Sequence, residues 1–312
     1  MSNNKPLTAH LCLFCAGAFW GLMAPIGKEA MLNGIDGIDM VSFRVLGGAV
    51  LFWITSLFTR KEHVPVKDIL KLAIAGIFAL VLNQCSYTIG LNMTSPSNSS
   101  IMTTSMPIFA MVLSFFILKE PITWKKAIGV FLGCSGAVII IMTSASAGSD
   151  KVGNIWGDLL CMSAQLSFAL YLSLFKPLVQ KYSLFTVNKW MFTWASIMIW
   201  PFTFSHVNSI DFATVPVSTW WETGYVVFFG TYLGYIFMMV GQKILRPTVV
   251  SVYNYVQPLV SVTVSVLAGL AVFKGAQAVA ALLVFSGVWL VIKSKSKRDM
   301  NAETTQEKTG NS

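Results

Sequence analysis

The sequence predicts an all-α integral membrane protein whose ten transmembrane helices form two inverted five-helix repeats. Hydrophobic residues make up 55% of its 312 residues and charged residues only 11%, whereas soluble chains average about 25% charged residues. Uncharged stretches such as residues 127–147 recur between short clusters of Lys and Arg. A helix crosses the hydrocarbon core of a bilayer with about 20 such residues. An internal similarity between the two halves of the chain predicts the repeat.

The apolar stretches define the predicted spans in chain order. Helices are expected for all of them, because a helix satisfies its own backbone hydrogen bonds in lipid and an open strand does not. The first repeat (residues 9–143) and the second (residues 155–293) each hold five spans, and the polar residues 294–312 are expected to form a disordered cytoplasmic tail. The spans cover residues 9–27, 38–58, 71–90, 97–118, 124–143, 155–175, 186–205, 220–240, 249–270 and 275–293.

The basic residues predict the orientation. If the N-terminus is cytoplasmic, most of the Lys and Arg residues fall on the inner side, and only Lys28, Lys151 and Lys274 fall outside. The positive-inside rule therefore predicts a multi-pass protein of a bacterial plasma membrane with both termini in the cytoplasm. This asymmetry and the anionic inner leaflet account for the net charge of +9, so no nucleic-acid partner is expected.

The reactive residue types argue against a membrane-embedded enzyme. All five cysteines fall inside predicted spans, so they give no disulfide framework. The three histidines lie at span ends or in loops, and no pair of Asp or Glu residues lies at mid-span. Catalysis requires acids, bases or metal ligands that converge. We therefore expect no catalytic residue, no metal and no cofactor.

The internal repeat is the strongest functional signal in the sequence. An offset of 151 residues aligns 96–141 with 247–292 without a gap and pairs Pro107 with Pro258. An offset of 148 residues aligns the first predicted span with the sixth. Five spans are an odd number, so the second half enters the membrane upside down relative to the first. Inverted repeats give transporters two related conformations with a substrate site near mid-membrane.

Three segments carry a resemblance to a known family. The first span ends in "AFWGLMAPIGK", spans four and five contain "ILKEPITWKKAIGVFLGCSGAVIII", and the last span closes with "FSGVWLVIK". With its five plus five spans, the chain resembles the EamA-like branch of the drug/metabolite transporter superfamily over about residues 9–293. The resemblance implies a secondary transporter with a central cavity lined by spans 1, 3, 4, 6, 8 and 9. One departure is that Glu120-Pro121 has Ala271-Val272 as its counterpart, so a role of Glu120 would not be duplicated.

Two prolines mark the first group of candidate site residues. Pro107 and Pro258 lie near the middle of their predicted spans, where each removes a helical hydrogen bond, so we predict bends that take part in gating. Each proline shares a helix face with polar side chains. We expect these faces to line a cavity; the alternative is that each hydroxyl bonds to a backbone carbonyl or to a neighbouring helix. These faces consist of Ser100, Thr103 and Thr104 in span 4, and of Ser251, Asn254 and Tyr255 in span 9.

Other polar or aromatic residues at depth complete the candidate set. A buried amide costs a few kcal/mol unless it is paired, so each requires a partner or a wet cavity. Arg44 lies inside a span and either acts on substrate or snorkels to the outer surface. The predicted substrate-binding residues are Trp20, Asn83, Tyr87, Ser100, Thr103, Thr104, Gln165, Tyr232, Asn254 and Tyr255.

The sequence therefore predicts a secondary transporter, expected to be an exporter, that moves a small organic metabolite such as an amino acid by alternating access. The alternative is a non-transporting membrane scaffold or sensor, which has no need of two symmetry-related gates. The expected partners are the metabolite and the lipid bilayer. Glycines spaced as in "GVFLG" (129–133) allow helices to approach closely, through either a homodimer contact or packing within the fold.

Overall fold

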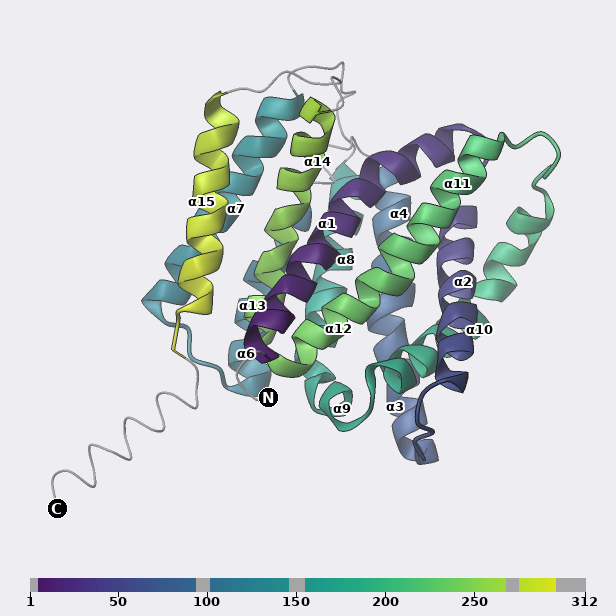
Figure 1. The fold of residues 1–312 in the computed structure, drawn as a ribbon, viewed down its shortest axis with the longest axis horizontal. Helices are drawn as coiled ribbons and strands as arrows, with labels where there is room; N and C mark the ends of the chain where they lie inside the picture. The colour runs from purple at the N-terminus through teal and green to yellow at the C-terminus, as the bar shows by residue number, and fades with distance from the viewer. Residues whose placement is uncertain (1–4, 94–101, 146–154, 268–274, 296–312) are drawn as a thin grey trace, which may run out of the picture.

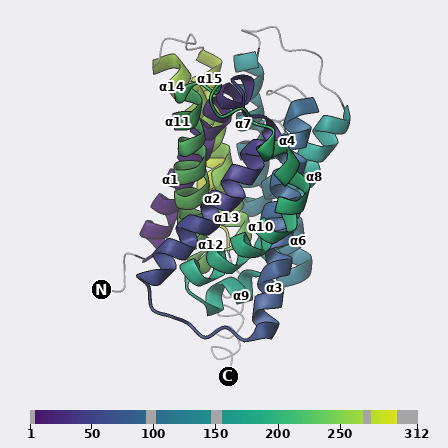
Figure 2. The same cartoon turned by 90° about the vertical axis from the view of Figure 1, so that its right-hand side faces the viewer.

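The computed structural model describes residues 5–93, 102–145, 155–267 and 275–295, and over these residues it contains helices and turns but no strand. The helices form a single bundle (Figures 1 and 2). Helix α1 begins and helix α15 ends at the lower end of the bundle in Figure 1, which is called the base. The opposite end, where α1 ends and α2 begins, is called the top.

The helices of the two halves follow the predicted order. In the first half they are α1 (Lys5–Leu32), α2 (Gly37–Leu57), α3 (Val66–Gly76), α4 (Asn83–Met93), α6 (Met106–Leu118) and α7 (Trp124–Ala145). In the second half they are α8 (Ile155–Leu174), the short α9 (Lys176–Lys181), α10 (Leu184–Asn208), α11 (Val217–Tyr225), α12 (Gly234–Ile244), α13 (Pro247–Val252), α14 (Val256–Leu267) and α15 (Gly275–Ile292). Each predicted span thus has a helical counterpart among the described residues.

Five helical segments of the described chain are long and apolar enough to cross a membrane. They are Pro6–Leu32, Gly37–Leu57, Val66–Leu91, Ile155–Leu174 and Val217–Ile244. Met106–Leu118 and Ala278–Ile292 are apolar but shorter. The chain is therefore an all-helical, multi-pass membrane protein, and the total of ten spans stays a prediction.

Polar caps fix where two of the long helices begin. The carboxylate of Asp36 accepts hydrogen bonds from the backbone N–H groups of Ile38 at 2.7 Å and Asp39 at 2.9 Å, at the start of α2. The Asp39 carboxylate accepts one in return from the backbone N–H of Asp36 at 3.3 Å. At the start of α10, the hydroxyl of Ser183 accepts from the backbone N–H of Thr186 at 3.2 Å. These bonds satisfy N–H groups that a helix start leaves without partners.

Helices from one half pack mainly against helices from the other. Helix α4 packs against α8, and α12, its counterpart in the second half, packs against α1. In the same way α6 packs against α8 and α14 against α1, while α2 pairs with α10 and α7 with α15. Figure 1 shows α7 and α15 side by side at the edge of the bundle. This exchange places the residues of α1, α4, α6, α8, α12 and α14 around a shared centre.

Glycines allow the closest of these approaches. A Cβ atom at Gly90 in α4 would lie 2.8 Å from the backbone oxygen of Gly157 in α8. One at Gly129 in α7 would lie 2.7 Å from the backbone oxygen of Gly287 in α15, and one at Gly136 would lie 2.6 Å from that of Ala280. The glycines of α7 therefore serve packing within the fold.

Helical regularity is broken at corresponding places in the two halves. Between α3 and α4 the chain forms a π-helical segment η1 (Ile77–Leu82), and between α11 and α12 it forms η2 (Val226–Leu233). Residues 104 and 105 form a turn before α6, and the 3₁₀ turn η3 (Tyr253–Tyr255) precedes α14.

The breaks near α6 and α14 change the position expected for the two prolines. Pro107 is the second residue of α6 and Pro258 the third residue of α14, so both lie in the first turn of a new helix. Proline is well tolerated there because the N–H groups of a first turn have no intrahelical partner. The regular α-helix is interrupted just before each proline. A role of these breaks in gating stays a prediction.

Candidate functional site

The centre of the bundle contains a cavity of about 990 Å³, a volume that includes the space at its mouth. Its walls come from both halves of the chain: α1, α2, α4, α6 and α8, together with η2, α12, η3 and α14. Met31, Met40 and Leu91 line it where α1 ends, α2 begins and α4 ends, so the cavity extends toward the top.

The structure brings together six of the ten predicted binding residues. Ser100 lies outside the described residues, and the remaining three predicted residues, Thr104, Tyr232 and Tyr255, do not line the cavity. The six that line it are Trp20, Asn83, Tyr87, Thr103, Gln165 and Asn254.

Thr104 and Tyr255 are buried in helix contacts. The Thr104 hydroxyl lies 3.6 Å from the Cys134 sulfur, and the fully buried Tyr255 donates its hydroxyl hydrogen to the backbone oxygen of Val130 at 3.2 Å. The expected shared face with Thr103 and Asn254 assumed a regular helix at about 100° per residue. The turn at residues 104–105 and the 3₁₀ turn η3 change that rotation, so neighbours in sequence face different surroundings.

Tyr232 packs among other aromatic rings, and Tyr235 takes the place expected for it. The ring of Tyr232 lies 4.9 Å from that of Phe52 and 5.7 Å from that of Phe228, measured between centroids. Tyr235 lines the cavity instead. The π-helical segment η2 has more residues per turn than an α-helix, so it rotates the following residues relative to a regular helix.

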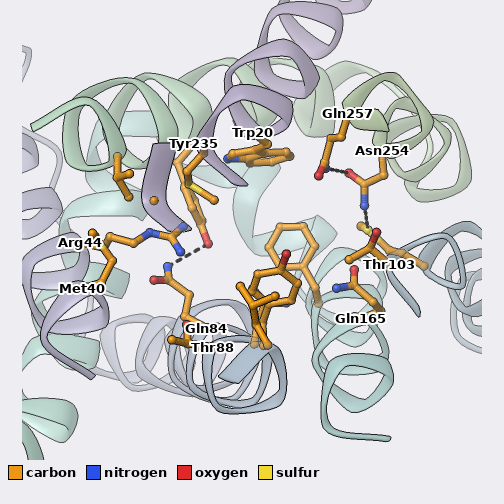
Figure 3. Close-up of a pocket in the computed structure, with 18 of the residues that line it drawn as sticks. Trp20, Met40, Arg44, Gln84, Thr88, Thr103, Gln165, Tyr235, Asn254 and Gln257 are labelled. Carbon is orange, nitrogen blue, oxygen red and sulfur yellow. Dashed lines mark hydrogen bonds between the residues drawn. The ribbon is translucent and has the colours of Figure 1, made fainter. Parts of the chain in front are cut away.

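Arg44 forms one pole of the cavity (Figure 3). It is only 8% exposed, so it does not snorkel to the surface. Its Nε donates a hydrogen bond of 3.0 Å to the hydroxyl of Thr231, which itself donates to the backbone oxygen of Val226 at 3.0 Å. Val226 lies five residues before Thr231, within η2. The π-helical segment therefore positions the hydroxyl that orients Arg44.

The π-helical segments also fix the aromatic walls. The indole N–H of Trp20 donates to the backbone oxygen of Gly230 in η2 at 2.8 Å. The hydroxyl of Tyr235 donates to the backbone oxygen of Ala79 in η1 at 3.1 Å and lies 3.4 Å from the amide nitrogen of Gln84. Such segments free backbone carbonyls from the regular helical pattern, and they often occur at functional sites.

Neutral amides form the opposite pole. The amide nitrogen of Gln257 donates to the side-chain oxygen of Asn254 at 3.1 Å, and the Asn254 amide contacts the sulfur of Met106. Figure 3 shows these groups across the cavity from Arg44, near Thr103 and Gln165. A Cβ atom at Gly21 would lie 2.6 Å from the backbone oxygen of Gln257, so this glycine allows α14 to approach α1 closely.

The structure adds four polar lining residues that are not among the predicted binding residues: Gln84, Thr88, Tyr235 and Gln257. A signal for two of them exists in the sequence, because Gln84 and Tyr235 are separated by the repeat offset of 151 residues. Gln257 directly precedes Pro258 and donates its side-chain amide hydrogen to Asn254, three residues earlier. Among the described residues, no group of three or more His, Cys, Asp or Glu side chains is arranged to hold a metal ion.

A polar network links helix ends at the base of the bundle. The carboxylate of Asp68, near the start of α3, lies 2.5 Å from the ammonium group of Lys181 and accepts the hydroxyl hydrogen of Tyr182 at 2.6 Å. Lys243 of α12 donates to the backbone oxygen of Tyr182. The hydrogen bond to Asp68 raises the pKa of Lys181 above its ordinary value. The network joins α3, α12, the last residue of α9 and Tyr182, which directly follows α9.

Comparisons with known proteins agree with this architecture. The model of the EamA-like transporter family matches residues 7–142 and residues 155–293. The uncharacterized transporter YetK of Bacillus subtilis is 23% identical over 299 residues, which cover 95% of this chain and 90% of that protein. The uncharacterized transporter YyaM of the same species is 24% identical over 91% of this chain and 93% of that protein.

One further relative and one solved structure extend the comparison. The S-adenosylmethionine/S-adenosylhomocysteine transporter of Chlamydia trachomatis is 26% identical over 48% of this chain and 44% of that protein. A solved crystal structure of a protein aligns with a TM-score of 0.73 at 17% identity, over 90% of this chain and 95% of that chain. A likeness at this level of identity shows a common fold.

Proposed function

Because the chain belongs to the EamA-like transporter family, we propose that this transporter exports a small organic metabolite, such as an amino acid, by alternating access. The observation that carries the proposal is the central cavity, whose walls come from both halves of the chain and whose lining carries amide, hydroxyl, aromatic and guanidinium groups. A substrate bound there is surrounded by two groups of helices, α1 with α12 and α14, and α8 with α4 and α6.

Two observations support the inverted repeat on which alternating access depends. The family model matches each half of the chain separately. The helix pairs also come in exchanged sets, α4 with α8 and α12 with α1. If the two halves exchange conformations, the packing that now closes the base would close the top, and the cavity would open toward the base.

The ends of the cavity suggest which conformation is present. Its lining extends toward the top, while the Asp68 network links helix ends at the base. With the base on the cytoplasmic side, as the positive-inside rule predicts, this is an outward-facing state with both termini in the cytoplasm of a bacterial cell. Reporter fusions at each terminus, one active only in the cytoplasm and one only outside it, test this orientation.

Flux through reconstituted protein tests the function. Purified protein in proteoliposomes is loaded in turn with radiolabelled amino acids, S-adenosylmethionine and a panel of other metabolites, and exchange with unlabelled compound is followed. We expect at least one compound to exchange faster than in protein-free liposomes, and Gln165→Trp, which fills the cavity, to abolish the exchange. No exchange of any compound would instead favour a non-transporting scaffold or sensor.

A further inference from the structure

The charge of the central cavity is unbalanced. Arg44 is the only charged residue among its described lining residues, which include no Asp, Glu, Lys or His. Burial of a charge without a partner is costly, and intramembrane charges mark functional sites by default. Thr231, the hydrogen-bond partner of Arg44, is neutral and contributes orientation without neutralising the charge.

The guanidinium group is held in a way that leaves its terminal nitrogens for a ligand. Only Nε has a hydrogen-bond partner among the described residues, and Figure 3 shows the terminal nitrogens on the cavity side, near Gln84 and Tyr235. Thr231 holds Nε at 3.0 Å and is itself held by Val226. A guanidinium fixed in this manner presents two parallel N–H donors, which match the two oxygens of a carboxylate.

The rest of the lining favours a substrate with one negative charge, and it can adapt to uncharged parts of different shapes. The pole opposite Arg44 carries the amides of Asn254 and Gln257, which bind neutral polar groups. Met23 and Met106 line the walls beside Trp20, and methionine side chains adapt to ligands of different shapes. A phosphate monoester carries about 1.5 to 2 negative charges at neutral pH, which a single arginine does not balance. A carboxylate carries one.

We propose that Arg44 binds the carboxylate of the substrate, and that the cavity therefore selects organic monocarboxylates over their neutral or cationic analogues. This inference rests on the proposed transport function and specifies its substrate class. Thr231 acts as a positioning residue, because it touches Arg44 and orients the guanidinium.

Matched ligand pairs test the inference by binding, independently of transport. The probes are benzoate with benzamide, indole-3-acetate with indole-3-acetamide, and N-acetylphenylalanine, N-acetylmethionine and N-acetylglutamine with their amides. Each pair differs by one charge at nearly constant shape. Affinity is measured by calorimetry on the purified full-length chain in detergent. We expect the carboxylate of a bound pair to bind about tenfold more tightly than the carboxamide, as for a hydrogen-bonded charged group.

Variants then assign the preference to Arg44. We expect Arg44→Gln to reduce the preference to less than about threefold, Arg44→Lys to keep part of it, and Thr231→Val to weaken it while the charge remains. Arg60→Gln, which removes an equal charge from an exposed segment near the base, is the matched control and keeps the full preference. If Arg44→Gln does not fold, the wild-type pairs still test the carboxylate preference, and Arg44→Lys and Thr231→Val still assign it to Arg44.

The outcomes separate this inference from the proposed function. Equal binding of carboxylates and carboxamides by the wild type, an unchanged preference in Arg44→Gln, or no binding of any carboxylate overturns the inference. Metabolite exchange in proteoliposomes without a preference for carboxylates overturns it as well and leaves the transport function standing. Preferential carboxylate binding without any exchange supports the carboxylate site and contradicts transport.

Discussion

The side-chain amide of Gln84 donates a hydrogen bond of 3.4 Å to the hydroxyl of Tyr235, and these two residues lie 151 positions apart in the sequence. The same offset aligns residues 96–141 with 247–292. Two residues related by a two-fold axis approach each other most closely near that axis, and both of these residues line the central cavity. The contact is therefore what inverted repeats around a shared cavity would produce.

Removal of the Tyr235 hydroxyl should weaken both the fold and the site. The hydroxyl donates to the backbone oxygen of Ala79 and accepts from Gln84. We expect Tyr235→Phe to lower the free energy of unfolding by about 1–3 kcal/mol, because it leaves buried polar groups without partners. Substrate affinity should fall as well. Thermal unfolding in detergent and ligand binding measure the two effects.

Tyr232→Phe is the control for this prediction. The Tyr232 hydroxyl has no hydrogen-bond partner among the described residues, and its ring is held by Phe52 and Phe228. We expect its stability to change by less than about 0.5 kcal/mol. Equal losses in the two variants would contradict a specific role of the Tyr235 hydroxyl.

The polar pole opposite Arg44 gives a second prediction. We expect Asn254→Ala and Thr103→Ala to reduce substrate exchange about tenfold, because each removes a polar group from the cavity wall. Membrane insertion should be retained. Ser251→Ala is the control, since the fully buried Ser251 hydroxyl donates to the backbone oxygen of Thr248 and does not line the cavity. Unchanged exchange in both cavity variants would remove these residues from the site.

Where helices are regular, the sequence was sufficient to predict which side chains face the cavity. Asn83 and Tyr87 lie four residues apart in α4, and both line the cavity as expected. It failed where the rotation per residue changes: η3 buries Tyr255 against Val130, and η2 exchanges Tyr232 for Tyr235. Neither π-helical nor 3₁₀ segments leave a hydrophobic pattern that identifies them. They depend on tertiary partners such as the Trp20 indole, which bonds the backbone of η2.

The contact between α7 and α15 gives a third prediction. A Cβ atom at Gly129 would lie 2.7 Å from the backbone oxygen of Gly287, and backbone on both sides leaves little room to adjust. We expect Gly129→Ala to lower the free energy of unfolding by about 1–3 kcal/mol. Gly275→Ala is the control, because a Cβ atom there meets nothing within 4 Å. If Gly129→Ala is as stable as Gly275→Ala, the result would contradict close packing of α7 against α15 at this glycine.

Glu62 makes stability depend on pH. Burial alone would raise its pKa, but hydrogen bonds from the backbone and hydroxyl of Ser183 and from the hydroxyl of Thr186 outweigh this and hold the pKa below the ordinary value of 4.5. A depressed pKa stabilises the folded state above the ordinary value. This contribution is lost as the pH falls below 4.5 through the folded-state pKa.

Comparison with a neutral variant measures that contribution. We expect Glu62→Gln to have a lower melting temperature than the wild type at pH 7, and we expect the difference to shrink as the pH falls below 4.5. The reason is that the wild-type carboxylate then becomes neutral like the amide. A difference in melting temperature that stays constant from pH 7 to pH 3 would show that the charge of Glu62 does not stabilise the capped start of α10.

Asp68 links α3 to its neighbours at the base of the bundle. Its carboxylate holds Lys181 at 2.5 Å and Tyr182 at 2.6 Å, so it ties α3 to the segment before α10. If the two conformations of alternating access differ by the closure of this end, loss of the charge should shift the population toward a state open at the base. We expect Asp68→Asn to increase the fraction of molecules in that state.

Distances between spin labels measure this shift. Labels on cysteines introduced at Lys67 in α3 and Ile244 in α12, in a background without the native cysteines, report the separation at the base. Asp68→Asn should add a population at longer distance, because the tie to α3 is broken. Asp211→Asn removes an equal charge from an exposed loop at the top and should leave the distribution unchanged. An unchanged distribution in Asp68→Asn would mean that packing alone closes the base, since the network would then contribute nothing to the equilibrium.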